Sequence, residues 1–393
     1  MEKTLDYTSE PPRDRLQLIV RKDKPFNAEP HLPDLVEHPI TPLNRFFCRN
    51  HGPLPLLDDN HTISIGGVGL ATKVLYTVKQ LKDMFHEKTI EMVMQGNRRD
   101  GLHKVKHTKG VIWGPGAIGN AVYSGCLLKD VLDHANVNFA SEDITRLHLA
   151  FESVEECEEE RCYGSSIPLT KALDEFGDVL LAYKMNGEPL TQDHGAPIRV
   201  VVPGIPSSLL PPVTVVMTTS NLTLVLAFKT EESNSYFQRK DYKILPGEVE
   251  TEQEAADYWC KVPSIAEYNV QSYVCDPSDG LVDRSCRRIV ARGYAVSGGG
   301  RGIQRVEVSG DDGKTWTVAS FVHRPAKAPS SINVWGWCLW EAEVNVKRNT
   351  RIVSRALDSA GNIQQENPIW NFRGVMNNSW RTIDRERAED ANL

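Results

Sequence analysis

The chain has 393 residues, which is long enough for two or three domains. Apolar residues make up 40% of it and charged residues 25%, the proportions of an ordinary globular protein. The formal net charge is −7 and no basic face is indicated, so the composition argues against nucleic acid as a partner.

The start of the chain is polar and acidic and lacks the apolar stretch of a secretory signal peptide. The eight cysteines are spread thinly, so we expect a reducing intracellular compartment rather than secretion. Cys157 and Cys162 raise the alternative of a zinc site, but no second Cys or His pair follows at ligand spacing. We therefore assign no metal ligand from the residues alone.

The first two thirds of the chain divide into an arm and a mixed domain. Residues 1–45 are rich in Pro, Asp and Glu and predict an extended N-terminal arm. Residues 46–250 alternate short apolar runs with helical patterns and predict an α+β domain. Strands are expected at residues 62–68, 179–185 and 198–202, and a short amphipathic helix at residues 77–85.

The stretch at residues 205–228 carries no charge, which raises the alternative of a membrane span. Pro206, Pro211 and Pro212 would break a spanning helix, and the many Ser and Thr residues disfavour transfer into lipid. We therefore interpret this stretch as a divergent insert within the α+β domain and expect no membrane partner.

A second pattern begins near residue 265 and continues to residue 393. Short strand-like runs alternate with Gly and Asp turn signals, which predicts an all-β sandwich of immunoglobulin type. Cys275 and Cys338 could join the two sheets, but we favour reduced core cysteines. The strand-like runs are residues 289–296, 305–309, 315–319 and 351–356.

Several Gly-marked loops of the α+β domain carry Arg and His. These side chains, together with free backbone N–H groups, suit a phosphate or another oxyanion. One such loop alone is more often a turn with a solvated charge, but several in one domain favour an anion-binding pocket. The loops are residues 49–53, 96–99, 114–120 and 193–195.

Nine motifs follow one another along most of the chain: 47–53 (FCRNHGP), 96–99 (GNRR), 117–121 (AIGNA), 163–168 (YGSSIP), 186–190 (NGEPL), 193–204 (DHGAPIRVVVPG), 238–243 (QRKDYK), 293–301 (GYAVSGGGR) and 370–375 (WNFRGV). In this order they resemble the signature segments of the sulfite oxidase family. The arm, at residues 10–12 and 25–29, resembles that of the plant-type members. The haem-carrying cytochrome domain of the animal members has no counterpart in the sequence, so we expect the plant-type form, with oxygen as electron acceptor.

The resemblance implies a fold and an activity. The fold is a sulfite-oxidase-type molybdopterin-binding α+β domain followed by an immunoglobulin-like sandwich that forms a homodimer. The activity is oxidation of sulfite to sulfate by oxygen-atom transfer at a Mo-molybdopterin cofactor, in which the metal carries the redox chemistry. The expected partners are therefore sulfite or sulfate, or a similar small oxyanion, and a second copy of the chain.

The resemblance also implies site residues. Arg49 and Arg373 would bind the sulfite oxyanion with paired donors, and Tyr242 would donate a hydrogen bond beside the metal. The cofactor would be held by Phe47, Cys48, Arg49, Asn50, His51, Glu155, His194 and Arg199.

The chain departs from the family at two places. The family reads Gln-Cys-Ala-Gly-Asn-Arg-Arg, and its cysteine thiolate binds molybdenum, whereas this chain passes from Gln95 directly to Gly96. If Met94 replaced the cysteine, its neutral thioether would be a poor ligand for a high-valent metal. Cys48 is a remote substitute. After Gly204 the family's cofactor-binding lysine also has no clear counterpart, with Lys229 a candidate by rough position only.

Three explanations of these departures stay open. The chain is a divergent paralogue without molybdenum chemistry, or it binds the pterin without a protein ligand to the metal, or the gene model is faulty, with a splice junction misplaced at Gln95 and intron translated after Gly204. The first of these leads to the main alternative function, a catalytically inactive dimeric protein that binds an oxyanion or serves as a scaffold. A nitrate-reducing relative is a third interpretation. The final residues, Ala391-Asn392-Leu393, resemble a weak peroxisomal signal, so we expect a peroxisomal or cytosolic protein.

Overall fold

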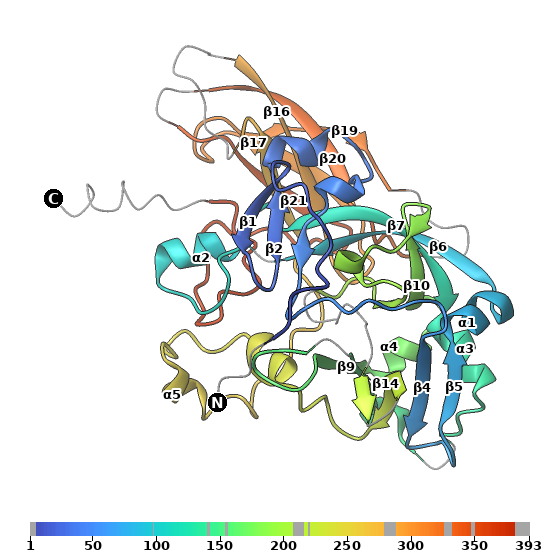
Figure 1. Ribbon diagram of the computed structural model, residues 1–393. Coiled ribbons are helices and arrows are strands. Elements are labelled where there is room, and N and C mark those ends of the chain that lie inside the picture. The colour runs from blue at the N-terminus through green and yellow to red at the C-terminus, as the bar shows by residue number, and fades with distance from the viewer. Residues whose placement is uncertain are drawn as a thin grey trace.

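A computed structural model describes most of the chain (Figure 1). It confirms the predicted fold class, a mixed α+β part followed by an all-β part made of two sheets. The described residues are 5–96, 98–139, 142–153, 156–206, 216–218, 221–278, 288–325, 332–346 and 350–381.

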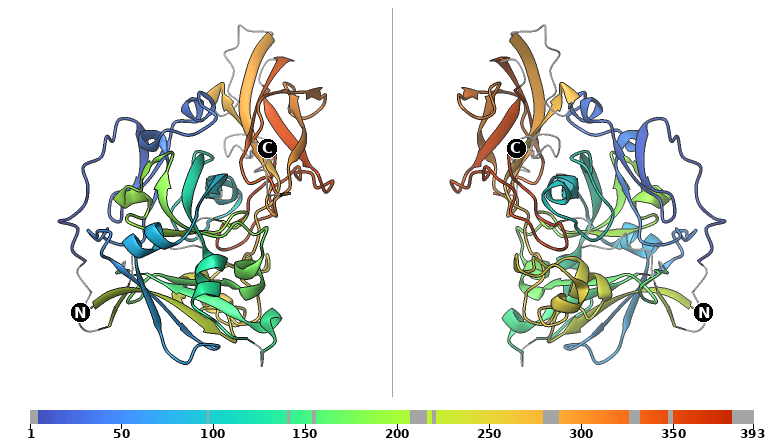
Figure 2. Two further views of the ribbon diagram at one scale, coloured as in Figure 1. Left: turned by 90° about the vertical axis from the view of Figure 1, so that its right-hand side faces the viewer. Right: turned by 90° about the vertical axis from the view of Figure 1, so that its left-hand side faces the viewer.

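The N-terminal arm lies along the outer side of the molecule (Figure 2) and forms a small antiparallel sheet with the first motif. Its strands are β1 (Leu18–Lys22), β2 (Asn27–Pro30) and β3 (Cys48–Arg49). In the register of β2 and β3, Asn27 lies opposite Arg49. Two 3-10 helices, η1 (Leu32–Val36) and η2 (Leu43–Arg45), connect β2 to β3.

A five-stranded sheet forms the centre of the α+β domain. Its order is β11-β10-β7-β6, with β12 also paired to β10. Nearly every residue of β7 is buried, because both faces of this strand are covered. The predicted strands at 179–185 and 198–202 are confirmed as β10 and β12. The bounds are β6 (Glu87–Gln95), β7 (Ile118–Leu127), β10 (Leu180–Met185), β11 (Glu188–Pro189) and β12 (Arg199–Val201).

The other sheet of the α+β domain has the order β5-β4-β14-β8-β9, with β13 paired to β14. The predicted strand at 62–68 is confirmed as β4. The described end of the stretch at 205–228 belongs to this sheet, because β14 is a central strand that pairs in parallel with β4 and antiparallel with β8. The divergence of the stretch stays a prediction. No helix among the described residues is long and apolar enough to cross a membrane. The bounds are β4 (Thr62–Gly67), β5 (Val74–Thr77), β8 (His148–Glu152), β9 (Gly164–Pro168), β13 (Val216–Thr218) and β14 (Asn221–Lys229).

The helices of this domain are short, and local sequence explains where they begin. The predicted helix at 77–85 is confirmed as α1, which starts with a capping box formed by Thr77 and Gln80. The same box, formed by Thr251 and Glu254, starts α5. The bounds are α1 (Val78–Met84), α2 (Arg99–Val105), α3 (Leu128–His134), α4 (Leu169–Leu173), α5 (Glu252–Ala255), η3 (Ile144–Arg146), η4 (Gln192–His194) and the π-helix η6 (Phe237–Asp241).

The C-terminal part has two antiparallel sheets with orders β15-β16-β20-β19 and β18-β17-β21. Their inner faces share a core in which Val306, Trp340 and Ala356 are almost fully buried. Cys275 and Cys338 are both free and buried, as predicted. The bounds are β15 (Gln271–Asp276), β16 (Arg288–Val296), β17 (Ile303–Ser309), β18 (Thr317–Val318), β19 (Ser320–His323), β20 (Cys338–Asn345) and β21 (Val353–Asp358).

The two parts pack directly on each other. One hydrophobic cluster contains Val93 and Ile118 from the central sheet together with Tyr294 and Trp337 from the C-terminal part. Trp335 also donates its indole N–H to Asp178, at 2.7 Å. This close packing brings the chain after β21 back to the α+β domain, where it completes the cavity described next.

Candidate functional site

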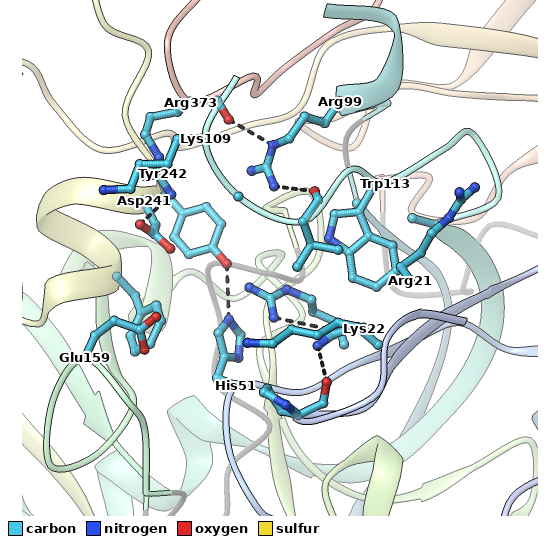
Figure 3. Close-up of a pocket in the computed structure, with 18 of the residues that line it drawn as sticks. Arg21, Lys22, His51, Arg99, Lys109, Trp113, Glu159, Asp241, Tyr242 and Arg373 are labelled. Atoms are coloured by element: carbon cyan, nitrogen blue, oxygen red, sulfur yellow. Dashed lines mark hydrogen bonds and ion pairs between the residues drawn. The ribbon is translucent and has the colours of Figure 1, made fainter. Parts of the chain in front are cut away.

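A cavity of about 430 Å³ lies where the arm, the first motif, the loop around α2 and the end of the chain meet (Figure 3). Its lining comes from segments more than 350 residues apart in the sequence, and basic side chains outnumber acidic ones. The charged residues of the lining are Arg21, Lys22, Arg49, Arg99, Lys109, Glu158, Glu159, Asp241 and Arg373.

Two of the cavity arginines have no acidic partner among the described residues. Arg49 donates from Nη1 to the carbonyl of Asn50 at 2.8 Å and to Oδ1 of Asn27 at 3.2 Å. Arg99 donates to the carbonyls of Arg373 and Val111, at 2.9 and 2.6 Å. Neutral acceptors therefore hold both guanidinium groups, and their positive charges are left available to an anion.

The positive charges of the cavity affect the pKa of Arg99. Burial, followed by the positive charges of Arg373 and Arg49, lowers the pKa of this guanidinium to about 10. The charged form of Arg99 is therefore destabilised, mainly by burial and then by repulsion from Arg373 and Arg49. Because a bound anion would relieve this repulsion, the cavity favours a small oxyanion over a neutral or cationic ligand.

Arg373 differs from Arg49 and Arg99 because it has a carboxylate partner. Its Nη2 lies 2.5 Å from Oδ1 of Asp241, and the Arg373 side chain is almost fully buried. Asp241 is the last residue of the π-helix η6, and Tyr242 follows it directly. This irregular turn therefore places a carboxylate and a phenol side by side in the cavity wall, a frequent use of π-helical turns.

Tyr242 and His51 meet inside the cavity (Figure 3). The Tyr242 hydroxyl lies 3.4 Å from Nε2 of His51, whose ring contacts the rings of Tyr163 and Phe237. Burial, followed by the positive charge of Arg49, holds the pKa of His51 well below its usual range. His51 is therefore neutral near pH 7 and interacts with the phenol as an uncharged partner.

The expected cofactor-binding residues divide into two groups. Phe47, Arg49 and His51 line the cavity, whereas His194 and Arg199 lie outside its lining. These last two form their own buried pair, in which Arg199 Nη1 donates to the His194 carbonyl at 3.0 Å. His194 Nε2 and Arg199 Nε are buried without a hydrogen-bond partner among the described residues. Two buried polar atoms of this kind fit a ligand rather than a finished protein core.

The remaining cofactor-binding predictions have other positions. Asn50 donates from Nδ2 to Asp193 at 2.9 Å and does not line the cavity. Glu155 lies outside the described residues, so its expected role stays a prediction.

No cysteine lines the cavity in the part of the chain that the structure describes. Cys48 packs in a small core with Phe26 and Ala28, and burial raises the pKa of its thiol. Met94 lies in another core cluster. Gly96 does line the cavity, but a Cβ atom there would lie 2.9 Å from the Cβ of Ala117. Neither substitute that the sequence raised reaches the cavity, and the backbone at Gly96 has no room for a side chain.

Several cavity residues were missed from the sequence. Arg99 was within reach, because it belongs to the GNRR motif of an anion-binding loop, but the sequence does not distinguish it from its neighbour Arg98. Arg98 turns away and donates to the carbonyl of Ser379 at 2.9 Å. Arg21 and Lys22 come from an arm whose path over the cavity has no local signal. For Asp241, the only indication in the sequence was its position next to the predicted site residue Tyr242.

Comparisons with known proteins agree with this geometry. The model of the oxidoreductase molybdopterin binding domain family matches residues 51–209, and that of the Mo-co oxidoreductase dimerisation domain family matches residues 262–386. Sulfite oxidase from Arabidopsis thaliana is 38% identical over 391 residues, covering 96% of both chains. Mitochondrial sulfite oxidase from Homo sapiens is also 38% identical, over 98% of this chain and 68% of its own.

Two more distant matches complete the comparison. Nitrate reductase [NAD(P)H] from Hordeum vulgare is 36% identical over 376 residues, which cover 91% of this chain and 40% of that protein. Among solved structures, the sulfane dehydrogenase SoxCD from Paracoccus pantotrophus superposes with a TM-score of 0.71, covering 96% of this chain and 91% of that one. At 21% identity, this last likeness concerns the fold alone.

Proposed function

The chain belongs to the sulfite oxidase family, and from that starting point we propose that its arginine-lined cavity binds sulfite and that the protein oxidises sulfite to sulfate with a Mo-molybdopterin cofactor. The observation that carries the proposal is the pair Arg49 and Arg99, two guanidinium groups without an acidic partner that face one small cavity. Such an arrangement stabilises a bound oxyanion in a space of limited size.

The protein's own residues supply binding and orientation. In the proposal, Arg49 and Arg373 bind the oxygens of sulfite, and Arg99, which donates to the Arg373 carbonyl, adds a third positive charge. The Tyr242 hydroxyl donates its one proton to the bound anion, and neutral His51 donates from Nε2 to the phenol oxygen. Trp113 is buried in the same wall and limits the access of water.

The residues present fit the pterin part of the cofactor. The buried atoms His194 Nε2 and Arg199 Nε are suited to an anionic or polar pterin group. Asn50 of the first motif donates to Asp193, the residue before His194. When bound, the cofactor supplies two-electron oxidation and the transfer of an oxygen atom. The protein's part is to hold sulfite beside it.

The residues present do not fit the protein-to-metal bond that the family resemblance implies, because no described cysteine lines the cavity. This observation favours a second candidate function, a redox-inactive protein that binds sulfite or sulfate through the same arginines. Both candidates require the oxyanion site, and they differ only in turnover.

One set of measurements on the purified full chain separates the two candidates. We expect sulfate binding by calorimetry in both cases. Sulfite-dependent reduction of ferricyanide, together with molybdenum in metal analysis, would establish the oxidase. Binding without molybdenum and without turnover would establish the redox-inactive protein. Absence of sulfate and sulfite binding would contradict both candidates.

We also propose that the chain is a homodimer, because its C-terminal part matches a dimerisation domain. Light scattering coupled to size-exclusion chromatography should give twice the mass of the chain, which is 44.0 kDa. A monomer at micromolar concentration would contradict this proposal.

A further inference from the structure

Asn27 belongs to the arm segment 25–29, to which the proposed function assigns no role. It is nevertheless part of the cavity lining, and its side chain is fully buried. The arm places it there because Phe26 and Ala28, on either side, pack against Cys48 in a small core. In the pairing of β2 with β3, Asn27 then lies opposite Arg49.

The orientation of the Asn27 amide is determined by its partners. Nδ2 donates to the carbonyls of Pro25 and Asn50, at 2.9 and 3.0 Å. Oδ1 accepts from Nη1 of Arg49 and from the backbone N–H of Asn50, both at 3.2 Å. A flipped amide would set its N–H groups against two other donors, so only this orientation satisfies all four hydrogen bonds.

A neutral partner matters for Arg49. The guanidinium is held by one amide oxygen and one peptide carbonyl, and neither cancels its charge. A carboxylate at position 27 would have nearly the same size and would still accept the hydrogen bond, but it would compensate the positive charge, as Asp241 does for Arg373. An amide at position 27 therefore orients the Arg49 guanidinium and leaves its positive charge uncompensated.

We propose that Asn27 is a positioning residue for Arg49: it fixes the guanidinium toward the cavity without neutralising it, so that the N-terminal arm is an integral part of the oxyanion site. This inference rests on the proposed binding of an oxyanion in the cavity. It holds for the oxidase and for the redox-inactive protein alike.

The test is calorimetric titration of the purified full chain with sulfate. We expect Asn27→Ala to weaken sulfate binding about tenfold, the effect of losing one hydrogen bond to a charged group. Asn27→Asp keeps the size and the acceptor, but it adds a negative charge and loses the two hydrogen bonds that Nδ2 donates, so it should weaken sulfate binding at least as much at pH 7. The matched control is Asn44→Ala in the same N-terminal region, where Asn44 donates to Gln17 at 2.7 Å on the surface. It should bind sulfate within about twofold of the unmodified chain.

A double-mutant cycle with Arg49→Ala distinguishes positioning from a general effect on the fold. If Asn27 acts through Arg49, Asn27→Ala has no further effect on sulfate affinity once Arg49 is removed. The same loss in both backgrounds would overturn the inference, and so would unchanged affinity in Asn27→Asp. If Asn27→Ala does not fold, Asn27→Asp carries the test.

The outcomes also separate this inference from the proposed function. If the unmodified chain binds no sulfate or sulfite, both are refuted. If it binds sulfate and Asn27→Asp binds it equally well, the oxyanion site stands and only the role of Asn27 is refuted.

Discussion

Arg373 and Asp241 form an ion pair, with 2.5 Å between Nη2 and Oδ1, in the wall of a cavity where Arg49 and Arg99 have no such partner. Two of the four guanidinium groups of the lining, those of Arg373 and Arg21, are thus paired with a carboxylate, and those of Arg49 and Arg99 are not. This asymmetry predicts how the site responds when its charges are changed.

Removing the carboxylate should strengthen anion binding and weaken the fold. In Asp241→Asn, the charge of Arg373 is no longer compensated, so we expect sulfate affinity to rise about threefold to tenfold at low salt, with a smaller gain at high salt. The melting temperature should fall, because Arg373 is buried. The control Asp83→Asn removes the partner of Lys79 in an exposed pair outside the cavity lining and should change the affinity less than twofold. Weaker sulfate binding in Asp241→Asn would contradict this prediction.

If a deletion removed the metal-binding cysteine, insertion of the two missing residues should make the chain retain molybdenum. Insertion of Cys-Ala between Gln95 and Gly96 should give a chain that purifies with molybdenum and reduces ferricyanide with sulfite. The single substitution Gly96→Cys should not, because its Cβ would lie 2.9 Å from the Cβ of Ala117. Metal analysis of both variants is the measurement. Equal molybdenum contents in the two would show that the insertion is not what the site requires.

Substitutions of the adjacent residues Arg98 and Arg99 should change different properties of the protein. Arg99→Met removes a cavity charge, and we expect sulfate affinity to fall about tenfold or more. Arg98→Met removes hydrogen bonds to the carbonyls of Asn377 and Ser379, so its main effect should be a lower melting temperature. Its sulfate affinity should stay within about twofold of the unmodified chain. Calorimetry and thermal unfolding of both variants check this, and a reversed pattern would disprove the assignment of Arg99.

The free energy of unfolding should decrease as the pH falls below about 6.5. Burial, with a smaller contribution from the positive charge of Arg199, lowers the pKa of His194 from its ordinary value of 6.5 to about 4. The unfolded chain therefore binds a proton that the folded chain rejects, and stability is complete above pH 6.5 and lost as the pH falls toward 4. Between pH 7.5 and 5.5 this amounts to roughly 1 kcal/mol.

Urea unfolding of the unmodified chain and of His194→Gln at both pH values isolates this contribution. The loss of unfolding free energy on acidification should be smaller in the variant by roughly 1 kcal/mol. His61, whose pKa burial also lowers to about 4, contributes to the loss in both proteins and cancels in the comparison. An equal loss in both proteins would show that His194 is not responsible.

The fold class could be predicted because local patterns agree with the fold. The helix α1 begins at a capping box that the sequence contains, and β10 and β12 are apolar runs of ordinary strand length. The path of residues 221–229 could not be predicted, because their run of apolar and Thr residues is ambiguous by itself. It becomes a central strand only through its pairing with β4 and β8.

Residues that were predicted from several separate motifs lie together in the structure. Arg49, His51, Tyr242 and Arg373 all line one cavity. Asn27 and Lys22 could not be assigned, because their roles depend on the arm crossing the first motif, a contact between distant segments. His194 and Arg199 were both named, but the sequence could not show that they form a buried pair apart from the cavity lining.

The cavity takes Asn27 from one end of the chain and Arg373 from the other, and Arg99 donates to the carbonyl of Arg373. During synthesis the central and arm strands can pair early, but the wall that contains Arg373 cannot be present until translation has passed that residue. Until then, Arg99 lacks the Arg373 carbonyl that accepts its hydrogen bond in the finished cavity. A truncation before Arg373 should leave a partly folded protein with no competent site.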